Sequence, residues 1–336
     1  MNDADKARPI AVIGAGSWGT ALALQFARGG RLVRVWDRDT TNLKKIANDG
    51  ANERYLPRVR FPENLRAELN LEACLDHVRD ILIAVPSHGF RETLLTIQPM
   101  LAADMRICWA TKGFELSTGL LPHQVAEDIL GPDRPMAVLS GPTFAKEVAA
   151  GLPTAMTIAA NDNEFASDVA EEISGENFRA YTAQDMIGVE VGGAVKNVLA
   201  IAAGLSDGLG FGANTRIALI NRGLVEMTRL GLALGAKQDT FMGLAGMGDL
   251  VLTCTDNLSR NRRMGLALAA GRTVEEVQQE IQQVVEGVLA AKAVHEVADH
   301  LSVDMPICLE LYRILYEARP PREAVSALMG RTLKPE

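Results

Sequence analysis

The sequence is poor in cysteine and has no excess of positive charge. Its four cysteines, Cys74, Cys108, Cys254 and Cys308, lie far apart and form no C-x-x-C pair, so the usual signals for a zinc site or a disulfide framework are missing. The formal net charge is −8 at pH 7, which gives the chain no general attraction to nucleic acid or to an anionic membrane. We therefore expect reduced thiols, no metal site and no nucleic-acid partner.

A secretory leader and a long apolar run are not expected either. Residues Met1 to Arg8 are polar and of mixed charge, unlike a signal peptide. No apolar run is expected to approach the length of a membrane span. The chain does have 336 residues, 48% of them hydrophobic, which is enough for two domains of ordinary size. These features predict a soluble, cytoplasmic, two-domain protein without stable membrane insertion.

A glycine-rich loop follows the first expected strand. The segment GAGSWG lies between an apolar run, Ile10–Ile13, and a helix-like run, Thr20–Arg28. Its glycines let the backbone turn tightly and approach a pyrophosphate, and the helix N-terminus offers N–H groups to the anion. A second strand ends in Asp37 and Arg38, where dinucleotide folds read the ribose. The pattern predicts a dinucleotide cradle; a glycine-rich turn without a ligand is the alternative.

The two halves of the chain have different periodicities. Short apolar runs alternate with helical ones in the first half, as in a parallel sheet covered on both faces. The expected strands are Ile10–Ile13, Leu32–Trp36, Ile81–Val85, Ile107–Ala110 and Ala137–Leu139, with Ala155–Ala159 and Phe178–Tyr181 as further candidates. From about Asp185 only helical spacing remains, over 216–234, 274–300 and 306–317. We predict an α/β Rossmann-type domain over 1–185 and an all-α domain over 186–336.

A lysine in the second half lies in an unusual helical segment. Gly192 and Gly193 precede Lys196 by four and three residues, although each mid-helix glycine costs about 1 kcal/mol relative to alanine. Such a segment leaves the surface beside the lysine bare, so that a ligand can approach. A lysine partly desolvated there is suited to acid/base work. The alternative is close helix packing, with Lys196 reaching out to solvent.

Two further segments and two strand ends carry polar groups. Asp249 and Thr253 lie one helical turn apart and are expected to hold a catalytic ammonium, although Asp249 would also suit a helix N-cap. The run SRNRR at 259–263 brings three guanidinium groups into an expected polar loop, which predicts a phosphate site or, alternatively, a solvated face. Lys112 follows one strand at the rim of the sheet, and a Gly-Pro turn at Gly141 follows another.

Together these motifs resemble one family. GAGSWG, VPSH, ATKG, SGPTFAKE, GGAVKN, GDLVLTCTDNLSRNRR and VVEG occur in the order found in soluble, nicotinamide-dependent glycerol-3-phosphate dehydrogenases, from Ile10 to Arg331. The bacterial type, which supplies glycerol 3-phosphate for phospholipid synthesis, is the most similar. The resemblance implies a Rossmann-type domain, a helical domain and a substrate cleft between them. It also implies reversible reduction of dihydroxyacetone phosphate to sn-glycerol 3-phosphate without a metal, and a homodimer, which exposed apolar helices also favour.

The resemblance also implies roles for individual residues. Lys196 would be the proton donor and acceptor at the C2 oxygen of the substrate, Lys112 would lie beside the reacting carbonyl, and Asp249 would orient Lys196. Substrate binding would further involve Gly141, Thr143, Asn197, Thr253, Ser259, Arg260 and Asn261. The dinucleotide would contact Gly14, Gly16, Ser17, Trp18, Gly19, Arg38, Lys112, Ala145, Arg260, Val284 and Glu286.

The choice of cofactor is left open by two adjacent residues. Asp37 is of the type that selects the free ribose hydroxyl of NADH, whereas Arg38 is at the position where the family uses a basic residue for the 2′-phosphate of NADPH. We favour NADPH and keep NADH as an alternative. Other functions compatible with the glycine loop are a related hydroxyacid or hydroxyacyl-CoA dehydrogenase and a non-catalytic NAD(P)H-binding sensor.

Overall fold

The computed structural model describes residues 8–281 and 284–331, which form two compact units. The first unit contains the described residues up to Lys112 together with Pro122–Met186, and the second contains Gly113–Leu121 and the described residues from Ile187 onward. The division expected at residue 185 placed 113–121 in the first unit. This short segment belongs to the second unit instead, because two of its large apolar side chains, Phe114 and Leu121, are buried in the hydrophobic core of the helical unit. A nine-residue segment is too short for periodicity to reveal its core.

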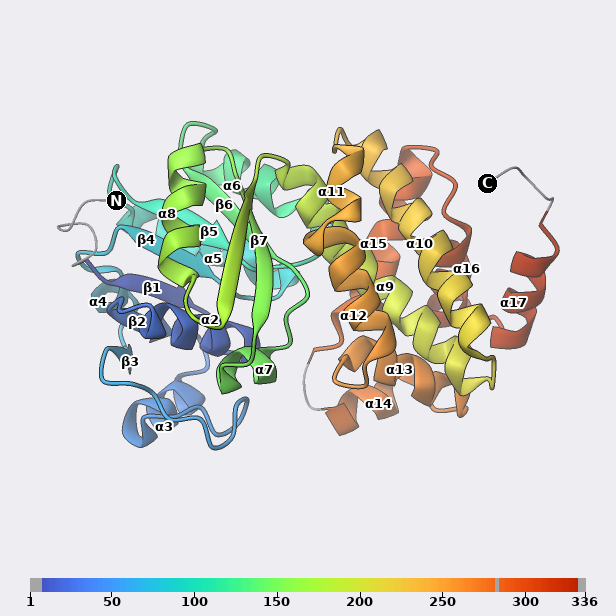
Figure 1. Cartoon of the computed structure of the whole chain (residues 1–336), viewed down its shortest axis with the longest axis horizontal. Helices are drawn as coiled ribbons and strands as arrows, with labels where there is room; N and C mark the ends of the chain where they lie inside the picture. Colours follow the sequence, from blue (N-terminus) through green and yellow to red (C-terminus); the bar gives the residue numbers. More distant parts are fainter. Residues whose placement is uncertain (1–7, 282–283, 332–336) are drawn as a thin grey trace. The chain divides into compact units, whose positions relative to one another are not determined.

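The first unit is an α/β unit built on one sheet (Figure 1). In chain order its elements are β1 (Ile10–Ile13), α2 (Ser17–Arg28), β2 (Val33–Trp36), α3 (Thr40–Asp49), β3 (Leu65–Ala67), α4 (Leu71–Leu75), β4 (Asp80–Ile83), η1 (Ser87–Gly89), α5 (Phe90–Ile97), η2 (Gln98–Met100), β5 (Arg106–Trp109), α6 (Pro122–Leu130), β6 (Met136–Ser140), α7 (Ala145–Ala150), β7 (Thr154–Ala160), α8 (Asn163–Ile173) and β8 (Phe178–Ala183). The strand order is β3-β2-β1-β4-β5-β6-β7-β8. All neighbours are parallel except β6 and β7. The predicted Rossmann-type fold is confirmed.

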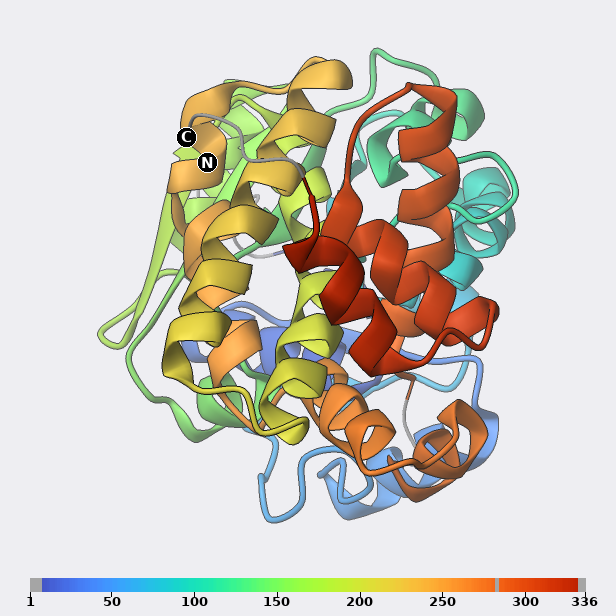
Figure 2. The ribbon, with the colours of Figure 1, turned by 90° about the vertical axis from the view of Figure 1, so that its right-hand side faces the viewer.

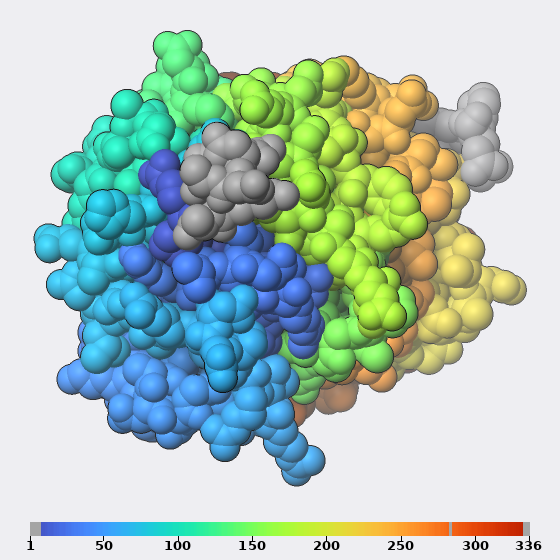
Figure 3. Space-filling model, turned by 60° about the vertical axis from the view of Figure 1, so that its left-hand side comes forward, coloured from blue at the N-terminus to red at the C-terminus, as the bar shows by residue number. Residues whose placement is uncertain are grey.

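Every expected strand is present, and one strand was missed. The four residues of β1, of β4 and of β5 are all buried, which explains their continuous apolar runs. The missed strand, β3, is a three-residue edge strand with the exposed Arg66 at its centre, too short and too polar to give a pattern. Figure 3 shows residues from the first part of the sheet-containing unit in blue next to yellow-green residues from its last part. Between these parts of the chain, Gln25 Nε2 of α2 donates to the carbonyl oxygen of Ile173 of α8 at 2.9 Å.

The sheet topology sets where a ligand can bind in this unit. β1 lies between β2 and β4, so the chain winds away from β1 in opposite directions on its two sides. In open parallel sheets, ligands bind beyond the carboxyl ends of strands at such a switch point. The glycine loop follows β1, Asp37 follows β2 and Val85 lies just after β4. The three segments therefore leave the sheet at the same edge.

The regular secondary structure of the second unit is all helical within its described residues, which confirms the predicted all-α class. Its elements are α9 (Met186–Gly208), α10 (Ala213–Ala233), α11 (Gln238–Met242), the π-helical turn η3 (Leu244–Gly248), α12 (Asp249–Thr255), α13 (Arg260–Ala269), α14 (Val274–Ile281), α15 (Glu286–His300), α16 (Pro306–Tyr316) and α17 (Pro321–Met329). Figure 2 shows α16 and α17 of this unit side by side in red.

The helical spacing over 274–300 covers two helices. α14 ends at Ile281 and α15 begins at Glu286, after Val285 with φ −98° and ψ 87°. The N–H of Gly287, in the first turn of α15, donates to Asn261 Oδ1 at 2.9 Å. A side chain of α13 thus fixes where α15 begins, and local spacing in the sequence cannot reveal a long-range contact of this kind.

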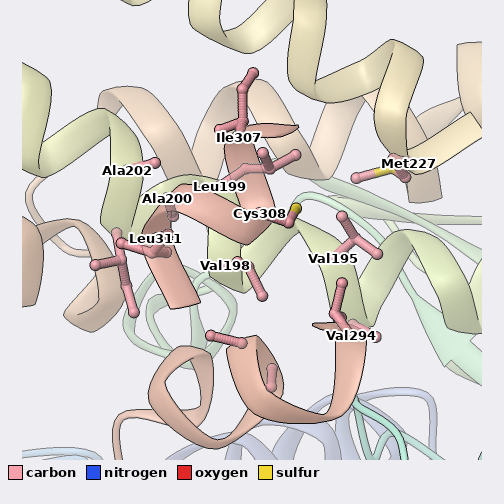
Figure 4. Packing of buried hydrophobic residues seen from close by; sticks show 14 of the residues in the cluster. Val195, Val198, Leu199, Ala200, Ala202, Met227, Val294, Ile307, Cys308 and Leu311 are labelled. Carbon is pink, nitrogen blue, oxygen red and sulfur yellow. The ribbon is translucent and has the colours of Figure 1, made fainter. Parts of the chain in front are cut away.

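α9 is the core helix of the second unit. By length and composition it could cross a membrane, so the expectation that no run reaches that length was wrong. However, 89% of its most apolar 18-residue window is buried in the protein. Figure 4 shows Val195, Val198 and Leu199 of α9 packed among apolar side chains of other helices, including Met227 and Val294.

Candidate functional site

The glycine loop after β1 has the backbone geometry of a phosphate cradle. Gly14 has φ +109°, and a Cβ built on it would lie 3.0 Å from the main chain of Ala84. A Cβ on Gly19 would lie 1.9 Å from the Gly14 oxygen, so only glycine allows the loop to pack on α2. Gly16 caps α2 without a side-chain hydrogen bond, and a Cβ there would meet no atom within 4 Å. The loop is therefore tight on its inner side and open at the helix N-terminus.

A buried donor in this loop also fits a dinucleotide. The indole Nε1 of Trp18 is buried and has no hydrogen-bond partner within the described parts of the chain. A buried N–H without a partner is costly, and a ligand oxygen satisfies it. The open space at Gly16 and the Trp18 donor are thus two independent features suited to a dinucleotide phosphate.

Two side chains hold the glycine loop from outside. Asp37 Oδ2 accepts the N–H of Ala15 at 2.6 Å, and its Oδ1 accepts the N–H of Asp39 at 2.9 Å. The buried Asn52 donates through Nδ2 to the Ala15 oxygen and to Thr20 Oγ1, both at 2.8 Å. Both peptide groups of Ala15 are therefore fixed. Asn52 was missed because it lies outside every motif, and only the folded chain brings it to the loop.

The neighbouring residue Arg38 is in a different situation. Its side chain is 71% exposed and lies 3.6 Å from Glu92 Oε2, whose side chain is 77% exposed. An exposed ion pair of this kind is weak, so the guanidinium can exchange it for another anion. Asp37 and Arg38 thus have distinct environments, which their adjacency in the sequence concealed.

Two other strand ends of the first unit carry predicted residues. Thr111 Oγ1 donates to the Val85 oxygen at 2.7 Å and ties together the loops after β4 and β5, just before Lys112. Gly141, after β6, has φ +151°, and a Cβ there would lie 2.9 Å from Met156 Cα. Thr143 Oγ1 donates to the Gly141 oxygen at 3.1 Å and precedes Ala145, where α7 begins.

The second unit holds a buried ammonium–carboxylate pair. Lys196 Nζ lies 2.5 Å from Asp249 Oδ1, and the two side chains are 9% and 1% exposed. Lys196 Nζ also donates to Thr253 Oγ1 at 3.2 Å. The Thr253 hydroxyl donates its own proton to the Asp249 main-chain oxygen at 2.5 Å. The sequence expectation that Asp249 and Thr253 share one face beside a lysine is confirmed, and Asp249 pairs with Lys196 instead of capping a helix.

Glycine at position 192 allows this pair to form. A Cβ on Gly192 would lie 2.5 Å from the Ala245 oxygen, so the main chain of η3 packs directly against α9. η3 leads straight into α12, whose first residue is Asp249. At Gly192, therefore, the close approach is made by the protein's own backbone, as in the helix-packing alternative. Lys196, in contrast, is buried and does not reach out to solvent.

Cys254 directly follows Thr253 in the sequence but is not a nucleophile. Burial raises the pKa of its thiol to about 12, although the charge of Lys196 lowers it in part. The group is therefore a neutral thiol near pH 7, and thiolate chemistry is excluded there.

Side-chain hydrogen bonds join three more of the predicted residues, two amides and a carboxylate. Asn261 Nδ2 donates to Asn197 Oδ1 at 2.8 Å, and Asn197 Nδ2 donates to Glu286 Oε2 at 3.4 Å. Asn197 directly follows Lys196 on α9, so the two clusters are adjacent on one helix. Val284, just before α15, has 39% of its surface exposed. The structure thus brings Asn197, Asn261 and Glu286 together.

The run at 259–263 is the start of a helix and not the polar loop that was expected. Ser259 is the N-cap of α13, and its Oγ accepts the N–H of Arg262 at 3.2 Å. The three arginines differ in burial: Arg260 is half-buried, Arg262 is buried and Arg263 is exposed. An N-terminus of a ten-residue helix with a serine cap and a nearby arginine suits a phosphate group.

Comparisons with known proteins agree on one family. The profile described as NAD-dependent glycerol-3-phosphate dehydrogenase N-terminus matches residues 9–166, and the corresponding C-terminus profile matches residues 185–326. A Tolumonas auensis protein named glycerol-3-phosphate dehydrogenase, with NAD(P)+ as cofactor, is 54% identical over 99% of this chain and 100% of its own. A Klebsiella pneumoniae protein of the same name is 54% identical over 97% of each chain. The crystal structure of glycerol-3-phosphate dehydrogenase from Coxiella burnetii has a TM-score of 0.94 and 50% identity, covering 97% of this chain and 99% of that one.

The contact at Gly192 leads to a prediction about stability. Gly192→Ala adds a Cβ against the Ala245 main chain, and we expect this overpacking to cost about 2 kcal/mol and to lower the thermal midpoint by roughly 5 °C. Gly212→Ala is the control, because a Cβ there meets nothing within 4 Å. Differential scanning calorimetry of both variants provides the measurement. A higher midpoint for Gly192→Ala, from the better helix propensity of alanine, would contradict the close approach.

Proposed function

Since this chain belongs to the NAD-dependent glycerol-3-phosphate dehydrogenase family, we propose that Lys196, Asp249 and Thr253 form its proton-transfer centre. The enzyme reversibly reduces dihydroxyacetone phosphate to sn-glycerol 3-phosphate with NADH or NADPH. The reaction turns a carbonyl into an alcohol, so a proton must reach the carbonyl oxygen as negative charge develops there. The single observation that carries the proposal is the buried contact of 2.5 Å between Lys196 Nζ and Asp249 Oδ1.

The surroundings of Lys196 define what it can do. Its ammonium is held by the Asp249 carboxylate and the Thr253 hydroxyl, both of which accept hydrogen bonds from it. As proton donor in reduction and acceptor in oxidation, Lys196 acts at the C2 oxygen of the substrate. Asp249 and Thr253 keep the nitrogen in place and stabilise its charged form. Burial strengthens these interactions, because water does not screen them.

Other residues bind the substrate ends. Ser259, Arg260 and Asn261 at the N-terminus of α13 hold the phosphate, for which the helix end and the guanidinium are suited. Asn197 holds substrate oxygens, and Lys112 lies beside the reacting carbonyl. Gly141 and Thr143 border the substrate, and glycine at 141 lets this loop pack against Met156.

The first unit binds the dinucleotide by the glycine loop. A bound nicotinamide dinucleotide supplies and accepts the hydride at substrate C2. Gly14, Gly16 and Gly19 shape the cradle, and Ser17 and Trp18 donate to the phosphates. Ala145, Lys112, Arg260, Val284 and Glu286 contact the remainder of the cofactor. The open space at Gly16 and the buried indole N–H of Trp18 support this assignment.

NADPH is the preferred cofactor in this proposal. Both carboxylate oxygens of Asp37 accept main-chain N–H groups, so this residue organises the loop. The exposed Arg38 is available for the 2′-phosphate, which it can hold by charge-assisted hydrogen bonds. These two environments support the preference for NADPH in this proposal.

The wider setting is also proposed. The enzyme is cytoplasmic and makes glycerol 3-phosphate for phospholipid synthesis; all four of its cysteines are buried and unpaired, as suits a reducing compartment. It forms a homodimer without stable insertion into the membrane. Exposed apolar side chains along α10, namely Ile217, Val225 and Leu232, support self-association.

Removing the amine of Lys196 tests the mechanism. We expect Lys196→Ala to lower kcat by roughly 10²–10⁴, the range for one general acid/base. The dissociation constant for NADPH, measured by fluorescence, should stay near the wild-type value. Lys292→Ala, which removes a half-exposed lysine from α15, is the control and should leave kcat unchanged. Turnover of Lys196→Ala near the wild-type rate would refute the proton-transfer role.

Removing the guanidinium of Arg38 tests the cofactor assignment. Arg38→Ala should raise the KM for NADPH about tenfold, as loss of a charge-assisted hydrogen bond implies, with the KM for NADH within about twofold. Asp37→Asn disturbs the glycine loop and should therefore weaken both cofactors alike. Steady-state kinetics with each cofactor gives the answer. An equal change for NADH and NADPH in Arg38→Ala would show that Arg38 does not read the 2′-phosphate.

Sedimentation velocity tests the proposed homodimer. We expect a mass twice that of the 36.2 kDa chain at micromolar concentration. Replacing Val225 and Leu232 by aspartate places charge on an apolar face and should shift the distribution to monomer. A wild-type protein that sediments as a monomer would exclude the dimer.

A further inference from the structure

Arg262 differs from the two other arginines at the start of α13. Its side chain is only 8% exposed and lies 2.6 Å from Asp207 Oδ2, in the last turn of α9. The same carboxylate oxygen receives Arg216 at 2.7 Å. The guanidinium of Arg262 is thus held inside the protein by a carboxylate that it shares with Arg216, whereas a phosphate-binding arginine must present its donors to the ligand.

The remaining donors of Arg262 bind the segment that leads to α13. Its Nε donates to Asn257 Oδ1 at 3.0 Å, and Nη1 donates to the Cys254 oxygen at 3.2 Å. That carbonyl belongs to the last turn of α12, where helix oxygens lack partners within the helix. The backbone N–H of Arg262 bonds Ser259 Oγ at 3.2 Å. One residue therefore connects the end of α12, the connecting loop and the cap of α13.

Close backbone packing fixes the same residue from the other side. A Cβ on Gly204 would lie 2.0 Å from the Arg262 oxygen, and a Cβ on Gly265 would lie 2.0 Å from the Ile201 oxygen. The first turns of α13 therefore lie directly on α9, with no side chain between them. Asn261, the residue before Arg262, reaches Asn197 of α9 from this position.

We propose that Arg262 is a positioning residue for the phosphate end of the substrate. It does not touch the substrate; it anchors the turn that presents Ser259, Arg260 and Asn261. The inference rests on the proposed function, in which these three residues hold the phosphate. Because the buried Arg262 guanidinium is held by Asp207, Asn257 and the Cys254 oxygen, the donors offered to the phosphate come from Arg260, and Arg262 determines where they lie.

The test uses Arg262→Lys in the full chain. Lysine keeps the charge facing Asp207 but lacks the planar fork that also reaches Asn257 and the Cys254 oxygen. We expect the KM for dihydroxyacetone phosphate to rise about tenfold, because small misplacements of binding groups are costly, while kcat changes less than about twofold. The dissociation constant for NADPH should not change. Arg263→Lys, at the exposed neighbouring position, is the matched control and should behave as wild type.

A milder variant keeps the proposal testable if Arg262→Lys does not fold. Asn257→Ala removes one acceptor of Arg262 from an exposed loop position and should raise the same KM about threefold. An unchanged KM in the folded variants would overturn the proposal. Parallel losses in kcat and in NADPH binding would overturn it as well, because they would indicate a general structural role.

A third variant separates this inference from the function on which it rests. Arg260→Ala should raise the KM for dihydroxyacetone phosphate, because it removes binding made in both the ground state and the transition state. If Arg260→Ala leaves that KM unchanged, the phosphate assignment itself fails. If Arg260→Ala raises it but Arg262→Lys and Asn257→Ala do not, only the positioning role fails.

Discussion

The proposed chemistry of the helical unit depends on one buried ion pair, Lys196 with Asp249. Transferring both charges out of water costs several kcal/mol for each ion, and the attraction between them offsets this only when the geometry is good and further hydrogen bonds are present. Thr253 supplies such a bond, and the 2.5 Å contact supplies the geometry. A pair of this kind contributes little net stability. In the proposed function its value is chemical, since it keeps the amine of Lys196 fixed in a buried position.

Glycines bring the elements around this pair close enough to interact. Gly192 lets η3 approach α9, and Gly204 and Gly265 let α13 lie on α9. A Cβ built on Gly287 would lie 2.6 Å from the main-chain oxygen of Asn197, so α15 also packs closely on α9. Each crossing removes helix stability, because glycine is a poor helix former. In exchange, short polar side chains such as Asn197 and Asn261 can reach one another. The polar geometry of the second unit is thus set by backbone contacts.

The sequence was sufficient for the fold class, and for the polar pair of α12, because both depend on local spacing. Buried parallel strands give continuous apolar runs, and Asp249 and Thr253 share a face because a helix repeats every 3.6 residues. Contacts between segments far apart in the chain could not be predicted from the sequence. Asn52, the hydrogen bonds of Asp37 and the burial of Arg262 depend on which segments meet, and the break before α15 depends on Asn261. The roles assigned to the site residues stay predictions.

The segment Gly113–Leu121 gives the chain an unusual connectivity. The polypeptide enters the helical unit, returns to the α/β unit at Pro122 and leaves it again after Met186, so three covalent links join the units. No single cut can separate them with both cores intact. Phe114 and Leu121 belong to the same hydrophobic core as apolar residues of α9 and α15. During synthesis these two residues emerge long before those helices. If the α/β unit folds on the ribosome, Phe114 and Leu121 therefore stay exposed until the helical unit has been synthesised.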